Sequence, residues 1–184
     1  MTGAPRELSD YSMEEIYLAA IKSETEANGV YSKLAAQMKG DLLKARLLRL
    51  ADDENKHATV LIQMFLKDFP GMSLNIPDKS PIPLPDIKDP MLYTPCDVLE
   101  SAIKAEWGAM EFYGAFSDIV KADAVKAMTL EYFYTMELGH MRLLEIELAY
   151  MKDKSGRMYD EAMGYIDEII GGTSKDGKDD TDVI

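Results

Sequence analysis

Two segments decide the fold: LADDENKHATVL at residues 50–61 and YTMELGHMRLL at residues 134–144. They contain the only two histidines of the chain, and each histidine follows a glutamate by three residues, as Glu54–His57 and Glu137–His140. Residues three apart lie on one face of a helix. Apolar residues extend from both motifs at alternating steps of three and four, the pattern of a helix packed in a bundle. The segments therefore predict two helices that direct Glu and His inward.

Two further helices each supply one inward glutamate. Glu24 opens ETEANGVY (residues 24–31) and Glu106 opens EWGAMEFY (residues 106–113), so both are followed by alanine at the third position and tyrosine at the seventh. Glu54 follows Glu24 by 30 residues, and Glu137 follows Glu106 by 31. The two halves of the chain thus read as repeats of one helical hairpin, and they predict an all-α bundle with twofold pseudosymmetry.

The link between the halves is rich in proline. Seven of the eight prolines fall within FPGMSLNIPDKSPIPLPDIKDPMLYTP, residues 69–95, which cannot form a continuous helix. We therefore expect a long crossover between the hairpins, with Asp41 and Asp123 as the N-caps that follow the two hairpin turns. RMYDEAMGYIDEII, residues 157–170, predicts a short fifth helix. Residues 1–171 are then one domain, and residues 172–184 an acidic, flexible tail.

Composition excludes several function classes. The 184 residues carry a net charge of −13, which repels nucleic-acid phosphates. The sequence lacks an apolar run of bilayer length, so a membrane role is not expected. The N-terminus shows no apolar signal segment, and Cys96 is the sole cysteine, which agrees with a reducing compartment. We expect a cytoplasmic protein.

Four glutamates facing an apolar core require positive charge among them, because burial and mutual repulsion both disfavour their ionised forms. Two divalent ions supply four positive charges against four carboxylates, while neutral imidazoles add nitrogen ligands. Oxygen-rich ligation with one imidazole per ion favours iron first and manganese second, and does not exclude zinc. A buried polar network or a single metal is the alternative. The predicted metal ligands are Glu24, Glu54, His57, Glu106, Glu137 and His140.

This ligand pattern is that of ferritin-like di-metal carboxylate proteins. Over residues 12–152, segments such as ETEANGVY, ENKHA and ELGHM resemble the rubrerythrin branch of that superfamily. The resemblance implies bridging carboxylates at Glu54 and Glu137, with Glu24 and Glu106 terminal or bridging and both histidines as nitrogen ligands. It also implies that Tyr31 and Tyr113 orient carboxylates from outside the ligand set, although both tyrosines also fit as plain core residues.

The chain departs from rubrerythrins in two respects. They usually carry a C-terminal rubredoxin domain with four cysteines, whereas this chain has one cysteine, so we expect an external electron donor. They also tend to carry a second glutamate three residues after the third-helix ligand, where this chain has Ala109. In that respect the site is more similar to the ferroxidase centre of bacterioferritins.

The resemblance implies a di-iron oxidoreductase of the peroxidase or ferroxidase type, which reacts with peroxide or dioxygen at a carboxylate-bridged metal pair and serves in oxidative stress. Ferrous-ion oxidation or iron storage, manganese-catalase-like peroxide dismutation, and a non-catalytic metal-stabilised protein are the alternatives, because all use the same ligand cradle. A homo-oligomer is expected for a bundle of this kind.

Overall fold

The structure, a computed structural model, describes residues 7–38 and 40–153. All regular secondary structure in the described residues is helical, which confirms the predicted all-α bundle. A 3₁₀ turn η1 (Leu8–Asp10) precedes four long helices: α1 (Met13–Gln37), α2 (Asp41–Asp68), α3 (Pro95–Ile119) and α4 (Ala124–Lys152). The predicted fifth helix and acidic tail lie outside the described residues.

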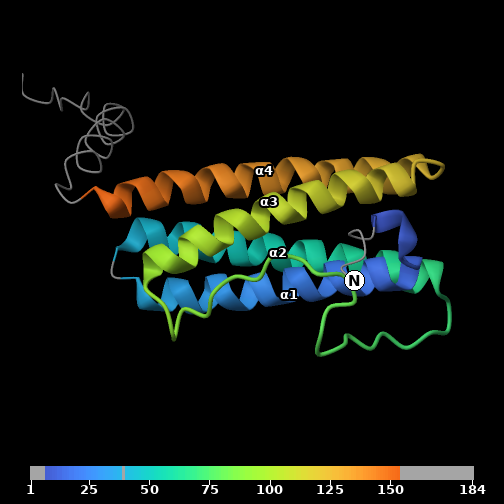
Figure 1. Cartoon of the computed structure of the whole chain (residues 1–184), viewed down its shortest axis with the longest axis horizontal. Coiled ribbons are helices and arrows are strands. Elements are labelled where there is room, and N and C mark those ends of the chain that lie inside the picture. The colour runs from blue at the N-terminus through green and yellow to red at the C-terminus, as the bar shows by residue number, and fades with distance from the viewer. Residues whose placement is uncertain (1–6, 39, 154–184) are drawn as a thin grey trace, which may run out of the picture.

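The four helices form two hairpins (Figure 1). Helix α1 packs along α2, and α3 packs along α4. Between the pairs, residues 69–94 contain neither helix nor strand. This crossover leaves one end of the bundle after α2 and returns along the α1 side to the other end, where α3 begins (Figure 1).

Side-chain caps explain where three of the helices begin. Ser12 caps α1 by accepting from the Glu15 N–H, and Thr94 caps α3 by accepting from Asp97. Asp123 accepts from the Lys126 N–H and caps α4, as predicted. The expectation for Asp41 was wrong, because Gly40 is the N-cap of α2 and Asp41 is its first helical residue. As an acidic residue of the first turn, Asp41 still stabilises α2 by its interaction with the positive end of the helix dipole.

Two apolar clusters fill the interior, one toward each end of the bundle. One contains Tyr17, Leu61 and Phe116, and the other contains Leu34 and Leu144, all at most 1 % exposed. The inward glutamates and histidines belong to neither cluster. They therefore form a polar layer between two apolar ones, which limits the access of water along the bundle axis.

The crossover is fixed to α3. Ile82 is buried in an apolar cluster, and the Lys88 N–H donates to Ser101 Oγ at 2.9 Å. The ring of Pro85 lies against Gly108, where an added Cβ would stand 2.7 Å from Pro85 Cδ. Glycine at this position is therefore required by a close approach of the crossover.

Replacing Gly108 with alanine should lower stability, although alanine is the better helix former by about 1 kcal/mol. The new methyl would collide with a rigid proline ring, and overpacking of this kind typically costs about 1–3 kcal/mol. Gly139→Ala is the matched control, because its Cβ would meet nothing within 4 Å. Urea unfolding should place Gly108→Ala about 2 kcal/mol below Gly139→Ala. Equal values would show that the Pro85 contact does not hold the crossover.

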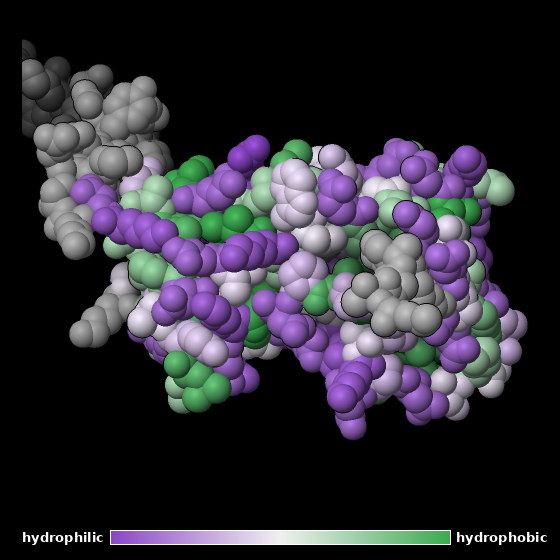
Figure 2. All heavy atoms as spheres, in the orientation of Figure 1, coloured by the Kyte–Doolittle hydropathy of each residue, from purple (hydrophilic) through white to green (hydrophobic). Residues whose placement is uncertain are grey.

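The face drawn in Figure 2 is predominantly hydrophilic, with hydrophobic side chains in small groups. Of the helices that the structure describes, none has the length and apolar composition needed to cross a membrane.

Candidate metal centre

The structure brings all six predicted ligand residues into the polar layer. Each of α1 and α3 contributes one glutamate, and each of α2 and α4 contributes one glutamate and one histidine. None of the six is more than 5 % exposed. They are Glu24, Glu54, His57, Glu106, Glu137 and His140.

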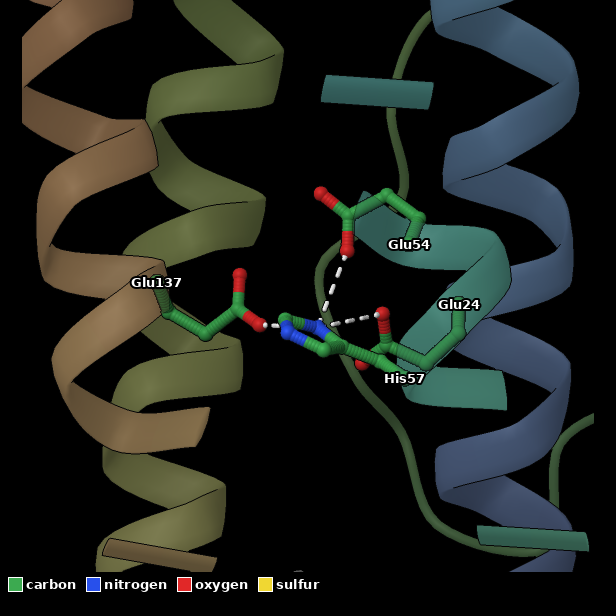
Figure 3. Close-up of side chains that lie close together, drawn as sticks. All are labelled: Glu24, Glu54, His57 and Glu137. Carbon is green, nitrogen blue, oxygen red and sulfur yellow. Dashed lines mark ion pairs between the residues drawn. The ribbon is translucent and has the colours of Figure 1, made fainter. Parts of the chain in front are cut away.

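One half of the centre forms around His57 (Figure 3). Its Nδ1 lies 2.9 Å from Glu137 Oε1, a residue of the opposite hairpin. The same nitrogen lies 3.4 Å from Glu54 Oε2 and 3.5 Å from Glu24 Oε2. A histidine nitrogen and three carboxylate oxygens therefore converge from three helices.

The other half forms around His140 in the same manner. Its Nδ1 lies 3.1 Å from Glu54 Oε1, 3.2 Å from Glu137 Oε2 and 3.7 Å from Glu106 Oε2. In both groups the four donor atoms lie within 4.8 Å of one another. Glu54 and Glu137 belong to both groups, whereas Glu24 and Glu106 each belong to one. The two groups could therefore hold two adjacent cations that share two carboxylates.

Both tyrosines of the repeated motif contact this cluster across the hairpins. Tyr31 of α1 donates its hydroxyl hydrogen to Glu106 of α3, and Tyr113 of α3 donates to Glu24 of α1. The tyrosines are at most 1 % exposed, and burial next to carboxylates raises the pKa of both hydroxyls well above its ordinary value. The hydroxyls therefore stay protonated and act as fixed donors.

The pKa values of the outer glutamates, Glu24 and Glu106, and of the shared glutamates, Glu54 and Glu137, shift in opposite directions. Burial, followed by repulsion from Glu54 and Glu137, raises the pKa of Glu24 and of Glu106. Burial acts in the same direction on Glu54 and Glu137, but the two histidines outweigh it, and the pKa of each shared carboxyl is lowered.

The histidines show the complementary effect. Burial disfavours the imidazolium form of His57, yet the carboxylates of Glu137, Glu24 and Glu54 raise its pKa to about 12. The pKa of His140 is raised in the same way, against burial, by Glu106, Glu137 and Glu54. In the absence of a metal, protons therefore supply the positive charge in this layer, and cations at the same place would displace them.

The donor set fits a metal pair. Among the described residues, four buried side-chain atoms have no hydrogen-bond partner: Glu54 Oε1, His57 Nδ1, Glu137 Oε1 and His140 Nε2. Buried polar atoms normally find partners. Two coordinated ions would satisfy the three atoms that lie within the cluster, since Glu54 Oε1 lies beside His140 whereas His57 Nδ1 and Glu137 Oε1 lie beside each other. Four carboxylates and two imidazoles are oxygen and nitrogen donors that suit iron or manganese. The site accordingly fits two divalent ions of this kind.

Sequence reasoning missed Asp53. Its Oδ2 lies 3.7 Å from Nε2 of His140, on the side of the ring away from the cluster. At this distance the two groups are not hydrogen-bonded, and Asp53 accepts instead from Lys56 at 3.0 Å. Asp53 therefore places a negative charge beside the ring without fixing its orientation. The residue equivalent to Asp53 in the second hairpin is Met136, so the two halves differ here. The sequence shows an aspartate directly before Glu54. Helical spacing alone could not predict that its side chain lies near a histidine of another helix.

Comparisons with known proteins agree with this geometry. The family model described as Rubrerythrin matches residues 15–85, which include Glu24, Glu54 and His57. A solved structure, "Hypothetical Protein Pfu-1136390-001 From Pyrococcus furiosus", is 31 % identical, with a TM-score of 0.68. The match covers 80 % of this chain and 96 % of that one. No curated protein matches the chain.

Proposed function

The chain belongs to the rubrerythrin family of ferritin-like di-iron proteins, and from this membership and its buried centre we propose that it is a di-iron oxidoreductase that reduces peroxide or dioxygen. Glu54 and Glu137 would bridge the two ions. Glu24 with His57 would complete one coordination sphere, and Glu106 with His140 the other. Manganese is the second choice of metal.

The observation that carries the proposal is the sharing of Glu54 and Glu137 between two donor groups. A metal pair held in this way supplies two electrons in its reduced form, the number needed to break an O–O bond. The residues would hold the pair in a layer closed at both ends by apolar clusters. Each shared carboxylate has two oxygens, so it can change its binding mode when the charge of the pair changes.

Tyr31 and Tyr113 keep the outer carboxylates in place. Each donates to one oxygen of Glu106 or Glu24, which leaves the second oxygen for the metal. Because the hydroxyls remain protonated, each donates a hydrogen bond that stabilises the ionised form of its carboxylate. This makes it easier for the carboxyl group to lose its proton when a cation binds.

An external reductant would return the electrons, since the one cysteine cannot form a four-cysteine iron site. We further propose that the protein acts in the cytoplasm as a homo-oligomer during oxidative stress. Co-purification with a small redox protein would test for the external reductant. Light scattering would test for the homo-oligomer.

A ferroxidase is the second candidate, favoured by Ala109. Rubrerythrins tend to have a glutamate at this position, and its replacement leaves the two halves of the ligand set equal, as in bacterioferritin centres. In such a protein ferrous ion is substrate as well as resident metal, so iron would accumulate beyond two ions per chain.

The test is metal analysis of protein from its native host, followed by anaerobic reduction and stopped-flow mixing with hydrogen peroxide or dioxygen. We expect about two iron ions per chain and oxidation of two ferrous ions per peroxide, because H₂O₂ takes up two electrons and two protons to give two waters. Sustained oxygen release would instead indicate dismutation at manganese. A metal pair that reacts with neither oxidant would overturn the proposal and leave a structural role.

A further inference from the structure

A cavity of about 690 Å³ connects the carboxylates to the surface. It opens between α1, α3 and the crossover, and its wall includes Glu24, Glu54, Glu106 and Glu137. Among the described residues that line the cavity, neither His57 nor His140 occurs. A molecule that enters here therefore reaches the centre from its carboxylate side.

The cavity is much larger than hydrogen peroxide or dioxygen requires. A water molecule occupies about 30 Å³ in the liquid, and each of these oxidants has only two heavy atoms, so either would fill about a tenth of the space. Cavities of roughly 300–1,000 Å³ are typical of sites for small organic molecules. The half-open cavity therefore has room for an organic group beside a two-atom O–O group.

The lining next to the carboxylates is small and apolar. Three alanines of the lining are neighbours of the carboxylates along the helices: Ala27 and Ala109 lie one turn after Glu24 and Glu106, and Ala105 directly precedes Glu106. The crossover provides apolar residues for the outer wall. These outer residues are Pro83, Leu84, Pro85 and Ile87. An apolar group placed between the two walls is removed from water, which favours binding.

The outer wall is fixed in place on both sides of these residues. Ile82 precedes them and is buried, while the Lys88 N–H follows them and donates to Ser101. Pro85 itself rests on Gly108. The cavity is thus bounded by a segment anchored at three points, and its dimensions belong to the fold.

The mouth carries charges of both signs. Lys22, Lys33 and Lys79 lie there with four acidic residues, Glu26, Asp78, Asp86 and Asp89. Lys22 is already paired with Glu26 at 2.6 Å. With the four glutamates of the centre, acidic side chains outnumber the lysines of the lining, which disfavours an anionic ligand, and an uncharged organic group avoids this repulsion.

We propose that the substrate is an uncharged organic hydroperoxide, ROOH, whose apolar R group occupies this cavity while the O–O group meets the carboxylate side of the centre. This inference rests on the proposed function and names its substrate class. ROOH takes up two electrons, which the reduced metal pair would supply, and two protons (H⁺) from the solvent. The O–O bond breaks, and the products are the alcohol ROH and one water.

Single-turnover kinetics test the reaction. Ferrous-loaded, full-length protein is mixed anaerobically with cumene hydroperoxide, tert-butyl hydroperoxide or hydrogen peroxide. We expect a rate constant for cumene hydroperoxide at least tenfold above that for hydrogen peroxide. Ala105→Leu places a larger side chain in the cavity and should lower that ratio at least tenfold. Ala36→Leu, at an exposed position of α1 outside the lining, should leave the ratio unchanged.

Binding of cumyl alcohol, the unreactive product, tests the cavity without turnover. Calorimetry on the full chain, with and without metal, should give a Kd below about 1 mM, which Ala105→Leu weakens at least tenfold. Ile87→Ala, which shortens the opposite wall, should weaken binding by a smaller factor and keeps the test independent of how Ala105→Leu folds.

The outcomes separate the two proposals. If hydrogen peroxide oxidises the reduced protein, while cumene hydroperoxide is no faster and cumyl alcohol does not bind, the substrate inference is wrong and the proposed function stands. If no peroxide oxidises the reduced protein, the proposed function fails, and the substrate inference fails with it. Faster reaction with cumene hydroperoxide that is abolished by Ala105→Leu supports both.

Discussion

Glu137→Ala is expected to bind at most one metal ion per chain, against two for the parent protein. Glu137 supplies an oxygen to each donor group, so its loss removes a ligand from both positions. The helices should remain formed, because apolar clusters on either side of the layer are untouched. Elemental analysis after ferrous or manganous reconstitution gives the stoichiometry, and circular dichroism gives the helix content.

Glu131→Ala is the matched control for this variant. Glu131 lies on the same helix but is exposed, so its replacement should leave two ions bound. Glu54→Ala, which removes the other shared carboxylate, should behave as Glu137→Ala does. Two full equivalents in either ligand variant, or less than one in the parent protein, would refute the assignment.

Metal should also raise the melting temperature of the parent protein. Ligand present at 1,000 times its Kd stabilises a folded protein by about 4 kcal/mol, and in a chain of this size about 1 kcal/mol moves the melting temperature by roughly 2–4 °C. The loaded protein should therefore melt roughly 10 °C above the metal-free protein at neutral pH. Glu137→Ala should lose most of that difference, and equal melting temperatures for the parent protein would contradict the linkage.

Ala109→Glu should make the bond to His57 depend on the oxidation state of the metal. In rubrerythrins a glutamate at this position is thought to replace the helix-two histidine when iron is oxidised, which shifts one ion. Alanine offers no oxygen, so we expect His57 and His140 to remain ligands in both states of the parent protein. Position 109 lines the cavity that reaches the carboxylates, so a glutamate there has a path to the metal.

Crystal structures of reduced and oxidised protein decide this prediction. In the parent protein, movement of a metal by more than about 1 Å from His57 on oxidation would be incompatible with it, because ligand bonds near 2 Å do not stretch that far. Ala109→Gln is the control, since it has the same shape without the carboxylate charge. If Ala109→Glu retains the His57 bond in both states, the alanine is not what fixes the geometry.

Most of the fold followed from the spacing of apolar residues and prolines. Helices whose inward positions recur every three to four residues must pack on one another, and the proline-rich segment could not continue a helix. The six clustered residues followed from the same spacing, because Glu54 and His57 share a face and so do Glu137 and His140. Their roles as metal ligands remain a prediction.

The rest depends on contacts between segments distant in the sequence, which periodicity does not encode. Asp53 faces His140 because two helices pack at a particular rotation. Gly108 reads as an ordinary weak point of a helix until the crossover places Pro85 upon it. The cavity arises in the same way, from the path of residues 83–87 over the small side chains of α1 and α3.

Each hairpin donates a tyrosine hydrogen bond to a glutamate of the other hairpin, so the centre depends on both halves of the chain. Tyr31 serves a glutamate of the second hairpin and Tyr113 serves one of the first, so neither hairpin can complete the centre alone. Two copies of one hairpin, related by a twofold axis, would complete it for each other. The two halves are nevertheless not identical, because Asp53 lies 3.7 Å from His140 Nε2, whereas the equivalent position of the second hairpin is Met136.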